Sequence, residues 1–234
     1  MSDGTPIQAN LQKVMNLIAS SAAQSGRDPS SIRLIAVSKT FPVGMIREAY
    51  DAGVRDFGEN RVQEFMEKLP DLKLPGARFH MIGRLQSNKV RQAIAFDWIH
   101  TVDSERLAAR LQQAAGEVNK SISVLIEVKL SQEESKTGVE ASKVPDLARS
   151  IAKLDRLELH GLMGIPPYTS DPEGARHFFR RLRELRDSIQ NSGFDEAREL
   201  SMGMSHDFQV AIEEGATMVR IGSAIFGKRS YTEE

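Results

Sequence analysis

The sequence predicts an α/β fold, a single (β/α)8 or TIM barrel with one extra N-terminal helix. Short apolar runs of strand length alternate with amphipathic helical stretches along the chain, and about eight such units occur, as this fold requires. A length of 234 residues is also ordinary for one such barrel. No linker rich in Pro, Gly or Ser divides the chain, so residues 1–234 are expected to form a single domain.

The extra helix is expected at the N-terminus. Thr5 is a candidate N-cap, and Pro6 stands at the first helical position. Apolar residues then recur at helical spacing as far as Ala22, and Gly26 lies just beyond the expected end.

The expected strands are short runs rich in apolar residues. They are Ile32–Val37, Val54–Phe57, Arg78–Ile82, Trp98–Val102, Ser123–Val128, Leu157–Met163, Glu199–Met202 and Met218–Ile221. A helix-compatible stretch follows each run, and the first of these begins at Pro42 and ends near Gly53. The alternative is an open doubly wound sheet, whose dinucleotide-binding form needs a GxGxxG turn after an early strand. The first strand ends in Ser38-Lys39-Thr40 instead, which favours the barrel.

Charge and composition argue against several classes of function. A formal net charge of −1, with no strongly basic stripe, argues against binding to nucleic acid or to an anionic membrane. The chain has no cysteine, which excludes disulfides, thiolate metal sites and thiol nucleophiles. His160, His177 and His206 show no compact metal-ligand spacing, so no metal site is expected. Neither a signal peptide nor an apolar run of the ~20 residues that span a bilayer is found, and a cytoplasmic protein is expected.

Lys39 follows the first expected strand directly and is therefore expected at the mouth of the barrel, where functional groups gather. Apolar walls would destabilise its ammonium form and make the neutral amine available to a carbonyl carbon. A lysine that merely reaches solvent from a strand end is an equally good interpretation of the position alone.

The loops after the seventh and eighth strands carry features of a phosphate site. TIM-barrel enzymes frequently bind phosphate with these two loops, which here contain SMGMSHD and IGSAIFG. Ser205 is placed to cap a helix whose N-terminus would attract an anion. Gly222 permits a close approach to the backbone, and Ser223 adds a hydroxyl donor. An ordinary N-cap and a packing glycine explain each feature singly, but their combination favours phosphate.

Arg220 lies inside the last expected strand, among apolar neighbours. A buried arginine needs a specific acceptor, because an unpaired buried charge is too costly. An internal ion pair with a strand-end carboxylate would satisfy it without any cofactor.

Together these motifs resemble the pyridoxal phosphate homeostasis proteins, also called the YggS/PROSC family. The likeness runs from the first helix to Gly227 and includes LIAVSKT, FGENRVQE, FHMIGRLQSNK, ESKTGV, HGLMGIPP, SMGMSHDF and VRIGSAIFG. The resemblance implies pyridoxal 5′-phosphate (PLP) bound to Lys39 through a Schiff base. The residues that it assigns to form or support the phosphate cup are Ser201, Ser205, Gly222 and Ser223.

The same resemblance implies that Asn60 lies near the ring or the lysine. His80 and Lys136 match motif positions, although strand packing explains His80 nearly as well and a solvated loop explains Lys136. Arg220 would face the pyridine nitrogen, as in the similar barrel domain of alanine racemase. A cation at that place disfavours protonation of the ring and weakens it as an electron sink, which suits a carrier or a restrained catalyst.

The leading hypothesis is a non-catalytic protein that binds PLP and takes part in intracellular vitamin B6 and amino-acid homeostasis, with PLP-dependent apoenzymes as recipients. Alanine racemase needs a second domain and a tyrosine from the partner subunit. None of Tyr50, Tyr168 and Tyr231 has a matching context, although Tyr168 follows the sixth strand and could approach the mouth. A small amino-acid racemase and a Schiff-base aldolase stay open as alternatives. A monomer is expected. In alanine racemase the second domain supplies the dimer contacts, and no such domain is expected here.

Overall fold

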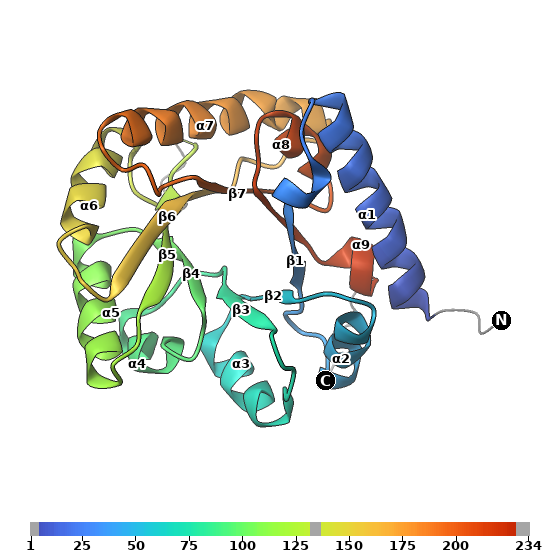
Figure 1. The fold of residues 1–234 in the computed structure, drawn as a ribbon, viewed down its shortest axis with the longest axis horizontal. Helices are drawn as coiled ribbons and strands as arrows, with labels where there is room; N and C mark the ends of the chain where they lie inside the picture. Colours follow the sequence, from blue (N-terminus) through green and yellow to red (C-terminus); the bar gives the residue numbers. More distant parts are fainter. Residues whose placement is uncertain (1–4, 132–136, 228–234) are drawn as a thin grey trace.

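The computed structural model describes residues 5–131 and 137–227, and within them eight parallel strands form one closed barrel (Figure 1). Each strand pairs with its neighbour in the chain, and β8 pairs with β1 to close the sheet. The predicted fold class is therefore confirmed.

The strands keep the predicted order, with bounds close to those expected from the apolar runs. They are β1 Arg33–Val37, β2 Asp56–Glu59, β3 Arg78–Met81, β4 Trp98–Val102, β5 Ile122–Val128, β6 Leu157–Gly164, β7 Glu199–Met204 and β8 Met218–Ile221. The largest shift is in β2, which was expected two residues earlier. Its two ends are buried carboxylates that bond to neighbouring side chains, and such residues give no apolar signal.

Helices cover the outer face of the barrel (Figure 1). They are α1 Pro6–Gln24, α2 Val43–Asp51, α3 Val62–Lys68, α4 Val90–Ala93, α5 Glu105–Glu117, α6 Val144–Ile151, α7 Arg176–Asn191, α8 Phe208–Glu213 and α9 Ser223–Phe226. Short 3₁₀ turns occur at Pro29–Ser31, Leu69–Asp71, Ser87–Lys89, Ala141–Lys143 and Pro172–Ala175. None of the helices in the described ranges has the length and apolarity needed to cross a bilayer.

The extra helix α1 begins as the sequence predicts. Thr5 Oγ1 accepts a hydrogen bond from the Gln8 N–H at 3.3 Å, and Pro6 occupies the first turn. The apolar face of α1 is buried against α8 and α9, so the helix covers the outside of the barrel where its first and last units meet (Figure 1).

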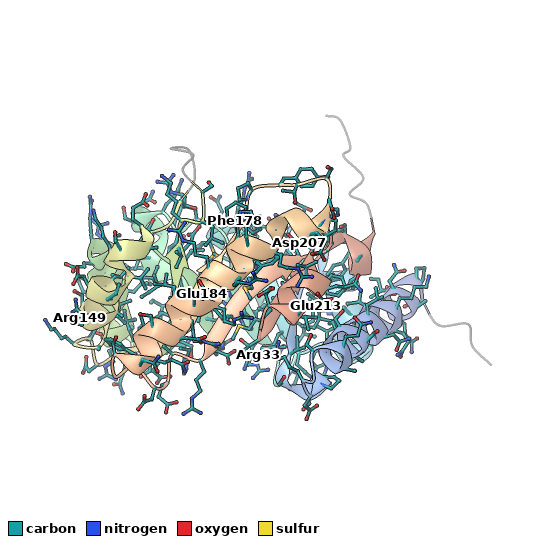
Figure 2. All side chains as sticks on the ribbon, turned by 90° about the horizontal axis from the view of Figure 1, so that it is seen from above. Arg33, Arg149, Phe178, Glu184, Asp207 and Glu213 are labelled. Atoms are coloured by element: carbon teal, nitrogen blue, oxygen red, sulfur yellow. The ribbon has the colours of Figure 1, made fainter. Side chains whose placement is uncertain are left out.

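The arginine-rich helix α7 lies along the outside of the barrel next to α8 (Figure 2). Three of its arginines converge on the buried carboxylate of Glu214: Arg176 at 3.2 Å, Arg180 at 3.0 Å and Arg183 at 3.1 Å. These basic residues therefore have a structural partner within the chain.

The interior of the barrel holds both apolar and polar layers. One buried cluster consists of Ile35, Trp98, Leu125, Met163 and Met218. Side chains two residues apart on a strand share a face, so Trp98 and His100 point to the same side of β4, as do Met218 and Arg220 on β8. His100 and Arg220 are consequently buried beyond the apolar cluster, in the direction of the strands' carboxyl ends.

Candidate functional site

Six of the seven predicted site residues line one cavity of about 320 Å³ at the carboxyl ends of the strands. They are Lys39, Asn60, Ser205, Arg220, Gly222 and Ser223. The other lining residues include Val37, Phe41 and Ile82, which give the cavity apolar walls beside the lysine.

Ser201, the seventh, lies beneath the cavity rather than in its wall. Its hydroxyl is fully buried and accepts a hydrogen bond from Arg220 Nη1 at 2.6 Å. His100 Nδ1 lies 2.9 Å from the same oxygen. The structure thus places Ser201 as a support for the arginine.

Ser205 does not cap a helix, and the prediction that it does was wrong. Helix α8 begins only at Phe208, after Asp207. Asp207 Oδ1 accepts a hydrogen bond from the Met204 N–H at 2.7 Å, so the chain makes a further turn before the helix starts. Ser205 Oγ instead accepts a hydrogen bond from the Gly222 N–H at 3.3 Å, which joins the loops after β7 and β8.

The chain can turn there because position 203 is glycine. Gly203 has a φ of +87°, and a Cβ at this residue would lie 2.6 Å from the Ala211 Cβ and 2.9 Å from the Phe208 Cα. A side chain would force apart the end of β7 and the helix that follows it.

A buried ion pair fixes the residue before Lys39. The Ser38 hydroxyl donates to Glu59 Oε1 at 2.8 Å, and Lys68 Nζ donates to the same oxygen at 3.0 Å and to the Ser38 carbonyl at 3.1 Å. Burial raises the pKa of Glu59, although Lys68 and Ser38 counteract part of that rise. This pair was not predicted, because the sequence gives little local signal for it beyond the glutamate in FGENR.

The residue after Lys39 is held from the same side. Thr40 has a φ of 67°, an uncommon value for a residue with a side chain, and its N–H donates to Glu64 Oε1 at 2.5 Å. Glu64 also pairs with Lys68 at 2.7 Å. The turn that carries Lys39 is therefore fixed on both sides by α3 and the end of β2.

Arg220 brings a positive charge to the floor of the cavity. Its Nη2 donates to the Gly164 carbonyl at 3.1 Å, and only 4% of the residue is exposed. Burial lowers the pKa of Arg220 to about 10, while the carboxylates of Asp207 and Glu127 counteract part of that fall. The guanidinium is therefore cationic at neutral pH.

The remaining candidates lie outside the cavity wall. His80 is fully buried, and Tyr168 is 83% exposed with its ring 5.6 Å from that of His206. The Tyr50 hydroxyl donates to the Pro75 carbonyl at 2.7 Å. The predictions for Lys136 and Tyr231 concern positions outside the described residues. In ranges 5–131 and 137–227, no three His, Asp or Glu side chains are grouped to hold a metal ion.

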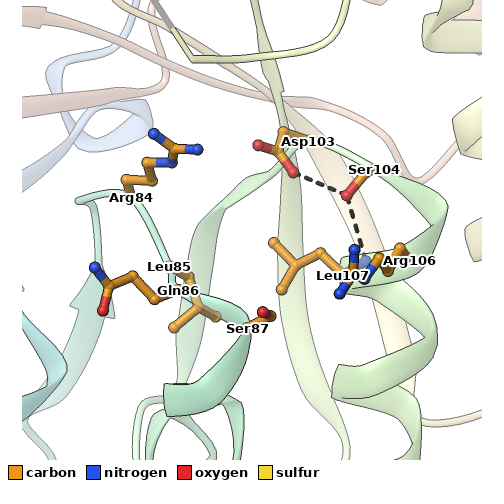
Figure 3. A pocket seen from close by; sticks show the side chains of 8 residues that line it. All are labelled: Arg84, Leu85, Gln86, Ser87, Asp103, Ser104, Arg106 and Leu107. Carbon is orange, nitrogen blue, oxygen red and sulfur yellow. Dashed lines mark hydrogen bonds between the residues drawn. The ribbon is translucent and has the colours of Figure 1, made fainter.

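A second pocket of about 510 Å³ lies at the ends of β3 and β4 (Figure 3). Arg84 and Arg106 in its lining are exposed to solvent. Ser104 Oγ accepts a hydrogen bond from the Leu107 N–H at 3.3 Å and so serves as the N-cap of α5. We place the functional site at Lys39 because its cavity combines an amine with the buried Arg220.

Sequence comparisons connect this chain to proteins of stated function. Residues 5–230 match the family model "Alanine racemase, N-terminal domain". The pyridoxal phosphate homeostasis protein of Aquifex aeolicus (strain VF5) is 45% identical over 222 residues, covering 94% of this chain and 97% of the relative. That of Escherichia coli (strain K12) is 42% identical over 233 residues, covering 97% and 99%.

Solved structures agree with this likeness. PipY of Synechococcus elongatus PCC7942, in a structure with PLP bound, is 41% identical and has a TM-score of 0.81, covering 90% of this chain and all of PipY. Alanine racemase of Clostridium difficile 630 has a TM-score of 0.75 over 96% of this chain and 58% of the racemase. At 14% identity, that second likeness shows a shared fold alone.

Replacing Lys68 by Met should lower the free energy of unfolding by about 3 kcal/mol at pH 8, because it leaves the buried Glu59 carboxylate without its cation. The loss should be smaller at pH 5. A carboxyl whose folded pKa lies above its unfolded value is protonated more readily in the folded state, so its stabilising effect is present at low pH and disappears as the pH rises through the folded pKa. Urea unfolding at the two pH values measures the difference.

The double variant Lys68→Met/Glu59→Gln is the matched control, because it removes both charges. It should recover part of the lost stability at pH 8 and show a weaker dependence on pH. Equal losses for Lys68→Met at both pH values would contradict the assignment of Glu59 as the group that titrates.

Proposed function

Because this chain belongs to the family of pyridoxal phosphate homeostasis proteins, we propose that it binds PLP on Lys39 through a Schiff base and takes part in vitamin B6 and amino-acid homeostasis in the cytoplasm. The observation that carries the proposal is the content of one cavity: a lysine amine, a wall of serine and glycine, and a buried arginine. These groups correspond to the aldehyde, the phosphate and the ring nitrogen of PLP.

Lys39 suits the aldehyde because its side chain lines the cavity together with Val37, Phe41 and Ile82. A primary amine can condense with the carbonyl carbon of an aldehyde to form a Schiff base. The ion pair of Glu59 and Lys68 holds the turn, so the reacting amine starts from a fixed backbone.

The joined loops after β7 and β8 suit the phosphate. Ser205 and Ser223 offer hydroxyl groups, and Gly222 lines the cavity with them. The backbone N–H groups of Ser223 and Ala224 begin α9, and in the described ranges they have no acceptor. Several donors thus surround the place where an anion would bind.

Arg220 suits an unprotonated pyridine nitrogen, since its guanidinium donates hydrogen bonds and cannot accept them. Bound PLP supplies an aldehyde and an electron-withdrawing ring, and a cation beside the ring nitrogen limits that second property. This arrangement supports storage and delivery of the cofactor more than stabilisation of a carbanion.

Two candidate side chains for proton transfer, Tyr168 and His206, lie in or near the cavity. Tyr168 is exposed outside its wall. His206 lines the cavity, but its Nε2 makes a hydrogen bond with the Thr169 carbonyl at 3.1 Å. We propose a monomeric carrier whose recipients are PLP-dependent apoenzymes. A small amino-acid racemase and a Schiff-base aldolase are the alternatives.

Borohydride reduction of the protein loaded with PLP should attach one pyridoxyl group to Lys39, and mass spectrometry of the peptides locates it. Lys39→Ala should lose both the adduct and the yellow colour, yet unfold near the wild-type temperature, because the side chain is only half buried at the mouth. Lys89→Ala, in a neighbouring pocket, is the control and should retain the adduct. An adduct that persists in Lys39→Ala would contradict the assigned lysine.

Ser205→Ala should weaken PLP binding about tenfold, because one hydroxyl to the phosphate is lost, and should leave pyridoxal, which has no phosphate, almost unaffected. Titration calorimetry with both aldehydes measures the two dissociation constants. Ser87→Ala, in the second pocket, should change neither. Equal weakening of both aldehydes by Ser205→Ala would mean that the serine does not contact the phosphate.

The protein loaded with PLP should leave the α-proton of L-alanine in place during prolonged incubation in D₂O, as followed by proton NMR. An authentic alanine racemase serves as the positive control. Rapid exchange of that proton would replace the carrier proposal with the racemase alternative.

A further inference from the structure

A continuous line of hydrogen bonds leads from Arg220 through the interior of the barrel to Asp56. Arg220 Nη1 is 2.6 Å from Ser201 Oγ, which is 2.9 Å from His100 Nδ1. His100 Nε2 is 3.0 Å from His80 Nδ1, and His80 Nε2 is 2.8 Å from Asp56 Oδ1. Each of the five residues is at most 5% exposed, so water does not compete for these bonds.

Asp56 ends the line as a carboxylate. Its Oδ2 accepts a second hydrogen bond, at 2.7 Å, from Arg78 Nη2. Burial acts to raise the pKa of Asp56, but the hydrogen bonds from His80 and Arg78 outweigh it and hold that pKa below its ordinary value. The group therefore only accepts hydrogen bonds at neutral pH.

The two imidazoles between the charged ends are neutral. Burial lowers the pKa of His80 and exceeds the opposing effect of Asp56, while Arg33 and Arg78 lower it further. Burial also lowers the pKa of His100 well below its ordinary value, with contributions from His80, Arg220 and Arg33. Each ring therefore has one donor nitrogen and one acceptor nitrogen.

These facts permit only one direction for the hydrogen bonds. Asp56 accepts, so the proton of His80 is on Nε2 and its Nδ1 accepts from His100. The proton of His100 is then also on Nε2, and its Nδ1 accepts from the hydroxyl of Ser201. The lone pairs of Ser201 are left for Arg220, and every bond points from the arginine toward the carboxylate.

The geometry points to His80 and His100 as positioning residues for Arg220: through their fixed tautomers they orient the Ser201 hydroxyl and so hold the guanidinium at the floor of the cavity. This inference deepens the proposed function and rests on it for the identity of the ligand. The line uses residues from five strands, whereas the neighbouring layer of the interior is apolar. Its end opposite Asp56 is Arg220, a buried charged residue that lines the cavity.

The first test uses protein free of cofactor. Long-range proton–nitrogen NMR of ¹⁵N-histidine protein should show His80 and His100 as neutral rings with the proton on Nε2 between about pH 7 and about pH 8. His160, His177 and His206, which are more exposed, act as internal references. An Nδ1–H tautomer or an imidazolium at either buried position would overturn the inference.

The second test compares His100→Asn with His100→Leu, whose side chains are nearly equal in size. Asn keeps an acceptor for the Ser201 hydroxyl, and Leu does not. His100→Leu should raise the dissociation constant of PLP about tenfold and His100→Asn only about threefold, with similar losses of stability in urea. If the two variants raised the dissociation constant of PLP equally, His100 would contribute only packing and the inference would be overturned.

The two tests separate this inference from the proposed function. If wild-type protein failed to bind PLP while both rings showed the Nε2–H tautomer, the proposed function would fail and the line of hydrogen bonds would stand. If PLP bound on Lys39 but the tautomers differed, the line would fail and the carrier function would stand.

Discussion

The pairing of β1 with β8 is the constraint on which the site depends. Arg33 lies opposite Met218 and Ala36 opposite Ile221, so the first and last strands run side by side in the same direction. Lys39 and Gly222 follow these two strands and line the same cavity at one end of the barrel, although they are far apart in the chain. Helix α1 covers the outside of this junction by packing on α8 and α9. An open sheet would leave the amine and the proposed phosphate loops at opposite edges.

Much of the fold was predictable because its signals are local. Strands and helices of a parallel barrel produce apolar runs and amphipathic stretches that can be located in sequence. Because functional groups of this fold gather at the carboxyl ends of the strands, the sequence also predicts that Lys39, Ser205 and Gly222 lie in one region. The structure brings these residues together in one cavity.

The features that were not predicted depend on contacts between distant segments or on the path of a single turn. Whether Ser205 caps a helix depends on Asp207, whose bond to the Met204 N–H delays the start of α8. The pairing of Glu59 with Lys68 and the contact of His80 with His100 depend on how strands and helices are placed in space. In the sequence, packing within a strand explains His80 nearly as well as its motif position does. The sequence therefore indicates that His80 is buried but does not show which polar atoms its ring contacts.

Arg220 connects the stability of the barrel with the chemistry of the cavity. A buried guanidinium is tolerated only where acceptors surround it, and here Ser201, the Gly164 carbonyl and the charges of Asp207 and Glu127 compensate for lost hydration. A carboxylate in its place would favour a protonated ring nitrogen and thus a stronger electron sink. In the proposed complex, the interior network that makes the arginine tolerable would also restrain the reactivity of the cofactor. A carrier that leaves amino acids unchanged requires such a restraint, and here it would come from the core of the barrel.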